Sequence, residues 1–179
     1  MNATLLRTWR CGLAVAALAA MITTPGLVSG SDDAAKKANL GEVLERAESM
    51  PSDARRDTDK RIAITVERVN QEARDRGQAT MTARLAAEFK VTGESLLEDK
   101  SEYSLSWGEL VIAHTLLANS GAGLGLVDLV DLRREGLGWG AIAFGLEFHM
   151  EDFEDMIKAE GRVAMGLSKT GGNVPPNLK

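Results

Sequence analysis

Apolar residues recur at helical spacing through most of the chain after residue 30. In the charged stretch 52–76, four of them follow one another at steps of four, three and four: Ile62, Val66, Val69 and Ala73. Such steps place side chains on one face of a helix. The segment 61–66 also alternates as a strand would, but the length of the stretch and its flanking Glu, Arg and Gln residues favour a helix. We therefore predict a long amphipathic helix that ends at Gly77.

Shorter helices are predicted on both sides of this stretch. A polar, Ala-rich helix over 31–50 stops before Pro51. Beyond residue 79 the apolar spacing predicts six short helices, at 80–90, 94–101, 107–119, 126–135, 139–146 and 150–160. Helices this short are marginal alone, so we expect large side chains to hold them in one core: Phe89, Trp107, Trp139, Phe144, Phe148 and Phe153. The predicted fold is all-α, a small bundle of short helices preceded by one or two amphipathic helices.

The apolar part of the chain contains two weak internal sequence repeats, which we call echoes. The segments 105–110 and 137–142 match at a shift of 32 residues, and each contains a Trp-Gly pair that is predicted to open a helix. The segments 85–91 and 142–148 match at a shift of 57 residues, and each contains an alanine small enough to let two helices approach closely. We therefore expect two helix-turn-helix-like corners in the bundle.

The first thirty residues have the three parts of a secretory signal peptide. Arg7 and Arg10 are the only charges there, an apolar run over 11–22 follows, and small residues stand at 28–30. The run is shorter than the roughly 20 residues that a membrane-spanning helix needs, which disfavours the alternatives of an uncleaved anchor or a core helix. We predict cleavage near Gly30, and hence a periplasmic or secreted protein with no stable membrane anchor after cleavage.

The mature chain is predicted to have three parts. These are a charged helical N-terminal region over 31–78, a compact helical domain over 79–160, and a disordered tail over 161–179 where the apolar pattern fades. The N-terminal helices carry many charges and few large apolar residues. Three states therefore remain open for them: loose packing, a coiled pair with another chain, or detachment from the domain.

Export would change both the charge and the cysteine content. The chain has 21 basic and 26 acidic residues and a net charge of −5, which loss of Arg7 and Arg10 changes to −7. Cleavage would also remove Cys11, the only cysteine, so no disulfide or thiol chemistry is expected. A negative body repels phosphate backbones, so we expect no nucleic-acid partner. An unknown protein with a basic surface is one partner that this charge favours, and simple solubility is the plainer explanation.

The segment 129–143 resembles the first two helices of helix-turn-helix proteins, because a helix that ends in Leu-Arg-x-x-Gly is followed by a tryptophan and Ile-Ala. The segment that begins at Leu85 resembles the same motif. The resemblance implies a mode of helix packing, whereas DNA binding also needs basic or amide side chains on the second helix. There, residues 150–158 carry four carboxylates and one lysine. A helix-turn-helix DNA-binding protein is therefore an alternative only if the signal-peptide prediction is wrong.

The chain as a whole is similar to a loosely defined group of small exported bacterial proteins, mostly uncharacterised. The shared elements are a Trp-Gly-x-Leu start, a Gly/Ser hinge, an L-R-x-x-G-x-G-W-G-x-I-A segment and a Gly/Pro/Lys tail, which stand here at 107–110, 119–121, 132–143 and 171–179. The resemblance implies a helical periplasmic or secreted protein with no assigned activity, and it carries over no catalytic residue and no cofactor.

Two places carry candidate chemistry. Glu147, Glu151 and Asp155 repeat every four residues around His149, so a helix there would offer oxygen ligands to a hard cation. A solvated acidic helix face is the interpretation that we favour. His114 lies in an apolar segment and has Glu109, or a carboxylate brought close by folding, as a candidate acid–base partner.

These observations predict an exported, non-catalytic interaction or structural protein without a cofactor or a resident metal. The enzyme-class alternative is a small periplasmic hydrolase that uses His114 with a carboxylate.

Overall fold

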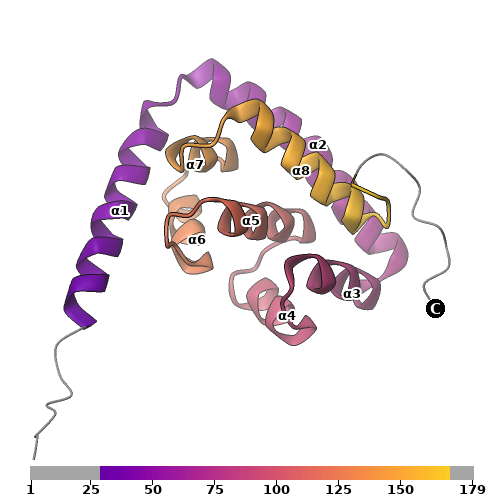
Figure 1. Ribbon diagram of the computed structural model, residues 1–179. Coiled ribbons are helices and arrows are strands. Elements are labelled where there is room, and N and C mark those ends of the chain that lie inside the picture. Colours follow the sequence, from indigo (N-terminus) through magenta and orange to yellow (C-terminus); the bar gives the residue numbers. More distant parts are fainter. Residues whose placement is uncertain (1–28, 170–179) are drawn as a thin grey trace, which may run out of the picture.

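The computed structural model describes residues 29–169, and this part of the chain is built from helices without strands (Figure 1). Its eight helices are α1 (Ser29–Ser49), α2 (Ser52–Arg76), α3 (Gln78–Phe89), α4 (Gly93–Glu102), α5 (Trp107–Asn119), α6 (Leu126–Arg134), α7 (Trp139–Gly145) and α8 (Met150–Ala164). The prediction of an all-α bundle is confirmed. The segment 61–66, which also alternates like a strand, lies inside α2.

The long helix α2 is the element against which α3, α5, α7 and α8 all pack. In Figure 1 it runs along the upper edge of the molecule behind α8, with α7, α5 and α3 below it. Its predicted apolar stripe faces this core: Ile62 and Val69 are buried, and Val66 and Ala73 are partly buried against the same cluster. A helix rich in charge is thus held by a narrow apolar face, with its charged residues on the other side.

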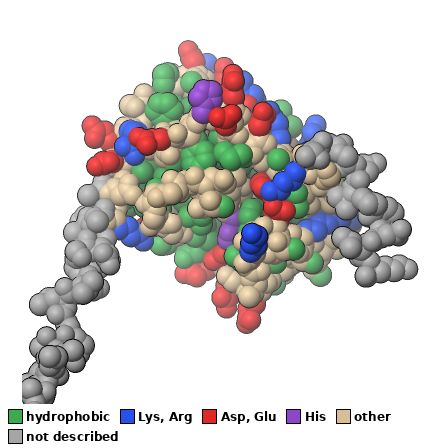
Figure 2. Space-filling model, viewed as in Figure 1, with side chains coloured by type: hydrophobic (Ala, Val, Ile, Leu, Met, Phe, Trp, Pro, Cys, Tyr) green, Lys and Arg blue, Asp and Glu red, His purple; other side chains and the backbone are tan. Residues whose placement is uncertain are grey.

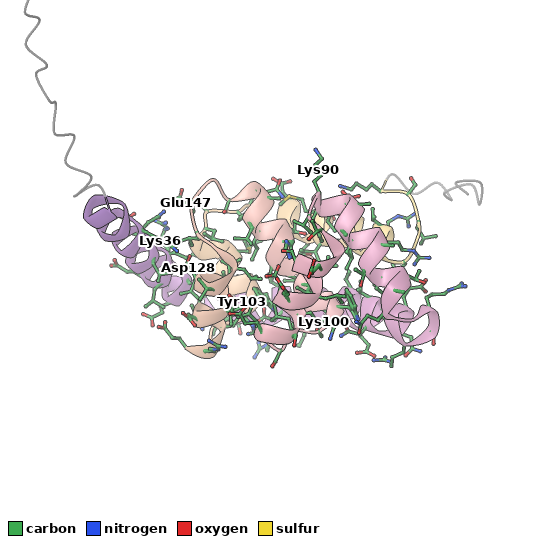
Figure 3. The ribbon with its side chains drawn as sticks, turned by 90° about the horizontal axis from the view of Figure 1, so that it is seen from below. Lys36, Lys90, Lys100, Tyr103, Asp128 and Glu147 are labelled. Carbon is green, nitrogen blue, oxygen red and sulfur yellow. The ribbon has the colours of Figure 1, made fainter. Side chains whose placement is uncertain are left out.

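Both N-terminal helices share the core of the remaining helices. Val43 and Ala47 of α1 and Met50, which directly follows it, are buried, and α1 packs along α7. Nearer its start, Lys36 of α1 lies with its Nζ 2.9 Å from Oδ2 of Asp128 on α6 (Figure 3). In the structure, therefore, α1 and α2 are packed against the domain predicted over 79–160, neither loosely attached nor detached from it.

The two predicted helix-turn-helix corners are present. One joins α3 to α4, where the side chain of Thr92 accepts a hydrogen bond from the backbone N–H of Ser95 and so begins α4. The other joins α7 to α8, where Glu147 has a φ of 65° and the N–H of Phe148 donates to the carbonyl oxygen of Ala143 at 3.0 Å, as the N–H of Val91 does to that of Ala86 at the first corner. Each corner turns the chain back onto the core, and the second one sets α8 against α2.

The C-terminal helix is longer than the sequence pattern indicates. It continues past the expected end at residue 160 to Ala164, which is fully buried, and Gly161 lies against the side-chain methyl of Thr65 on α2. Residues 165–169 follow, and Nζ of Lys169 lies 2.7 Å from Glu160 and 2.6 Å from Glu88. The predicted disordered tail over 161–179 is therefore wrong for 161–169. Its remainder, and residues 1–28 of the predicted signal segment, lie outside the described residues.

The large side chains contribute unequally to the core. Trp107, Trp139 and Phe153 are buried as expected, whereas Phe89, Phe144 and Phe148 are only partly buried at its edge. Leucine, isoleucine and methionine side chains fill most of the interior. Within residues 29–169, no helix is long and apolar enough to cross a membrane.

Candidate functional site

The two Trp-Gly pairs begin helices that dock on α2. At the start of α5, the backbone N–H of Gly108 donates to Oδ1 of Asn70 at 2.9 Å. At the start of α7, the backbone N–H of Gly140 donates to Oδ1 of Asp59 at 3.1 Å. Asp59 and Asn70 stand eleven residues apart, which is about three helical turns and places them on the same side of α2. The 32-residue echo therefore corresponds to two helix starts, each given a hydrogen-bond acceptor by α2.

Glycine follows tryptophan at both starts because no larger residue fits against α2. A Cβ on Gly108 would lie 2.7 Å from the Cα of Val66, and one on Gly140 would lie 2.8 Å from Cγ2 of Thr58. The first of these contacts is with backbone, which cannot turn aside. These close approaches bring the starts of α5 and α7 to the same flank of α2.

A hollow of about 620 Å³ opens on this flank, between α2 and the starts of α5 and α7, with Arg133 of α6 at its edge. We call it the α2 hollow. Its charged lining residues are Asp59 and Glu67 from α2, Glu109 from α5, and Arg133. Trp139 also lines it and is only 6% exposed. Its volume lies in the range of about 300–1,000 Å³ that small-molecule sites occupy.

The polar groups of the α2 hollow are partly engaged with one another. Oε2 of Glu109 accepts hydrogen bonds from the N–H of Ser106 at 3.0 Å and from its hydroxyl at 2.9 Å. Oε1 of Glu109 lies 3.7 Å from Nη2 of Arg133, and Nη1 of Arg133 donates to the carbonyl oxygen of Leu137 at 2.6 Å. The Arg133 guanidinium also lies 5.1 Å from the ring centroid of Trp139. Three carboxylates thus share this hollow with a single guanidinium.

The indole N–H of Trp139 has no hydrogen-bond partner among the described residues, although it is buried. A buried donor without an acceptor costs about 1–3 kcal/mol, so most such groups in folded proteins are paired. In this case the unpaired donor belongs to a residue that lines the α2 hollow.

His114 stands apart from the α2 hollow. It is buried in α5, its ring stacks on Phe89 with the centroids 5.0 Å apart, and its Nε2 lies 3.3 Å from Oδ2 of Asp99 on α4. Burial lowers the pKa of His114, and the nearby Asp99 carboxylate opposes that shift. Of the two candidate carboxylates, the structure thus brings Asp99 to this ring, while Glu109 is engaged at the start of α5.

The acidic segment does not form the cluster that the spacing predicts. Glu147 precedes α8 and has a φ of 65°, so it does not share a helical face with Glu151 and Asp155. Its carboxylate lies 3.8 Å from Arg46 of α1 instead. Asp155 pairs with Lys158 at 2.9 Å, and His149 is exposed. Among residues 29–169, no group of three or more His, Cys, Asp or Glu side chains is arranged to hold a metal ion.

Asp59 and Asn70, which accept hydrogen bonds from the two helix starts, were not predicted from the sequence. Both lie on a strongly charged helix, where a polar side chain is normally a solvated one. The sequence offered one signal for this arrangement. It contains a pair of Trp-Gly helix starts, and the preceding helix carries two short side chains, eleven residues apart, that can accept hydrogen bonds.

No protein-family model matches this chain, and neither a curated protein nor a solved structure matches it.

Proposed function

We propose that this protein is an exported, non-catalytic interaction protein that receives a basic side chain of a protein partner in the α2 hollow. The observation that carries the proposal is the charge of the hollow, whose lining holds three carboxylates, Asp59, Glu67 and Glu109, and one cation, Arg133, with Arg74 outside the lining but paired with Glu67. A site with an excess of carboxylates attracts an arginine or lysine side chain and repels phosphate. The negative charge of the whole chain acts in the same direction.

The geometry of the hollow also favours a side chain of a partner over a fully enclosed small molecule. Glu67 lies at the exposed rim and forms an ion pair with Arg74 at 2.6 Å, so the site opens to solvent along α2. Glu109, deeper in the site, has one oxygen occupied by Ser106 and the other 3.7 Å from Arg133. An incoming guanidinium therefore has both a shallow and a deeper carboxylate to pair with.

Binding of a nucleic acid would need a cluster of basic side chains on the protein surface. On the face seen in Figure 2, acidic and basic side chains are interspersed, and blue side chains do not gather into a large patch. The helix that would read DNA in the helix-turn-helix interpretation, α8, begins with Glu151 and Asp152. These features favour a protein partner over a duplex.

The hydrolase alternative now has a specific pair, His114 with Asp99. The histidine is only 9% exposed and is covered by the ring of Phe89, so a substrate would have to displace packed side chains to reach it. His114 is also absent from the lining of the α2 hollow. We therefore favour a structural role for this pair and an interaction role for the protein.

Export is the second part of the proposal, and it rests on the signal-like first thirty residues. Cleavage near Gly30 would leave in place the residues of α1 that the structure describes as buried, Val43 and Ala47. We expect the mature protein, isolated from fractionated cells, to begin close to Ser31 and to lie outside the cytoplasm. An intact Met1 on a cytoplasmic protein would contradict this part.

The binding part is tested by nuclear magnetic resonance with a short peptide that contains two arginines. After cleavage the mature chain keeps two tryptophans, Trp107 and Trp139, so their indole N–H signals report from two places in one molecule. The peptide should shift the Trp139 signal in a saturable way and leave the Trp107 signal in place. A matched peptide with glutamine instead of arginine should have no effect.

Glu109→Gln is the informative variant, because glutamine can still form the capping box with Ser106 but lacks the charge. It should weaken peptide binding by about two- to fivefold, the effect of removing one partly exposed ion pair. Glu98→Gln on the exposed side of α4 is the matched control and should change nothing. Equal binding by both variants, or a response at Trp107 alone, would contradict the proposed site.

A further inference from the structure

The outer side of α2, opposite the core, carries a stripe of exposed residues at steps of three and four on either side of the adjacent pair Ala63 and Ile64. We call it the outer stripe, and its members are Asp53, Arg56, Lys60, Ala63, Ile64, Glu67, Gln71 and Arg74. Steps of this kind form the seam of a two-helix coiled coil. Ile64 is 56% exposed and is the most exposed large apolar side chain of the described residues. Two shallow hollows flank the stripe and meet at Ala63.

The charges of the outer stripe are arranged symmetrically but with opposite sign about its centre. From the midpoint between Ala63 and Ile64, Lys60 lies as far in one direction as Glu67 lies in the other. Asp53 and Arg74 are related in the same way, whereas Arg56 is matched by the neutral Gln71. A surface with this property is complementary to a copy of itself turned through a two-fold axis.

From this arrangement we propose that α2 pairs with α2 of a second copy of this chain, in antiparallel orientation, through the outer stripe. Lys60 of each copy then faces Glu67 of the other, and Ile64 of each copy packs on the small Ala63 of the other. Each of these contacts occurs twice because of the two-fold axis. A parallel pair would set Lys60 against Lys60 and Glu67 against Glu67, so the charges select the antiparallel orientation.

The dimer is weak and sensitive to salt. Two apolar residues per copy make a small seam, at the low end of specific interfaces, which bury less than about 1,200 Å² in all. Some of the charged residues of the outer stripe already form ion pairs within a single chain: Glu67 pairs with Arg74, and Asp53 pairs with Arg56. Lys60 forms no ion pair within residues 29–169, so its contact with Glu67 of the other copy is an attraction added on dimerisation, and salt screens it.

This inference does not depend on the proposed function. Ala63 and Glu67 belong to both surfaces, but Glu109 lines only the α2 hollow and Lys60 lies outside it. Glu109→Gln should therefore weaken peptide binding and leave self-association unchanged, whereas a change at Lys60 should affect self-association first.

The test is sedimentation equilibrium of the mature protein at low salt, over concentrations from tens of micromolar to about a millimolar. Wild-type protein should show a monomer–dimer equilibrium that weakens as salt is added. Lys60→Glu and Glu67→Lys should each make the protein monomeric, since each places like charges opposite one another twice. The double variant Lys60→Glu/Glu67→Lys should restore the dimer, because the pair is then reversed but complementary.

Two further variants distinguish this interface from nonspecific hydrophobic association. Ile64→Ser should weaken the dimer, whereas Val127→Ser, at an exposed valine of α6, should leave it unchanged. Circular dichroism confirms that each variant is folded. A wild-type protein that stays monomeric at every concentration would overturn the proposal, and so would a double variant that fails to dimerise or single charge variants that dimerise normally.

Discussion

Replacing Gly108 by alanine should destabilise the protein, although alanine is ordinarily the better helix former. The added Cβ would lie 2.7 Å from both Cα and Cγ1 of Val66 and 2.8 Å from the Val66 carbonyl oxygen. Two of these atoms are backbone atoms of α2, a helix that packs against four others, so they cannot move without moving the core. Overpacking of this kind costs about 1–3 kcal/mol, and the rigidity of α2 points to the upper part of that range.

The helix propensity of alanine recovers about 0.5–1 kcal/mol of this cost. The net loss for Gly108→Ala should therefore be about 2 kcal/mol. Gly41→Ala in α1 is the matched control, because a Cβ there meets no atom within 4 Å. The control should stabilise the protein by about 0.5–1 kcal/mol, so one chemical change is expected to act with opposite sign at the two sites.

Urea unfolding of the mature protein, followed by far-ultraviolet circular dichroism, measures both changes. Gly108→Ala should lower the urea midpoint without a large change in the slope, and its Tm should fall by roughly 4–8 °C for a chain of this length. A Gly108→Ala protein as stable as wild type, with an unchanged slope, would show that α5 does not sit against α2 as closely as described.

Three further perturbations test separate contacts. Asp59→Ala should lower the free energy of unfolding by about 0.5–2 kcal/mol because the start of α7 loses its hydrogen-bond acceptor. Asp59→Asn can still accept from the N–H of Gly140 and should cost much less. Equal losses of stability for the two variants in urea unfolding would refute the capping role. Because burial lowers the pKa of His114, the unfolded chain binds a proton at a higher pH than the folded chain. The free energy of unfolding should therefore fall as the pH drops below about 6.5, and His114→Gln should flatten this dependence while the exposed His149→Gln should not. Gly161→Ala should lower the Tm, since the new methyl would overlap a threonine side chain of α2, and an unchanged Tm would argue against the close crossing of α2 and α8.

The helices were predictable because each buries one face, and burial of one face imposes a 3.6-residue period on the sequence. Ile62 and Val69 of α2 show that period clearly and are buried. The end of α8 was missed for the converse reason. Gly161 carries no apolar side chain and the pattern fades there, yet its lack of a side chain is what permits the close contact with α2.

The polar contacts of the site were not predictable in the same way. Asp59 and Gly140 are 81 residues apart, and no local rule relates an aspartate on a charged helix to the start of a distant one. The acidic segment shows the opposite error: the regular spacing of Glu147, Glu151 and Asp155 holds only if one helix contains all three, and the left-handed backbone at Glu147 prevents that. His114 was recognised as a candidate, but the identity of its carboxylate neighbour, Asp99, required the packing of α4 against α5.

Hydrogen–deuterium exchange of the mature protein, with and without the arginine peptide, tests most directly whether the flank of α2 is the binding surface. Protection should increase in the middle of α2 around Asp59 and Glu67 and at the starts of α5 and α7, and it should stay unchanged in α4 and in the first half of α1. Protection confined to α4, or to the C-terminal half of α8, would place the partner elsewhere and contradict the account.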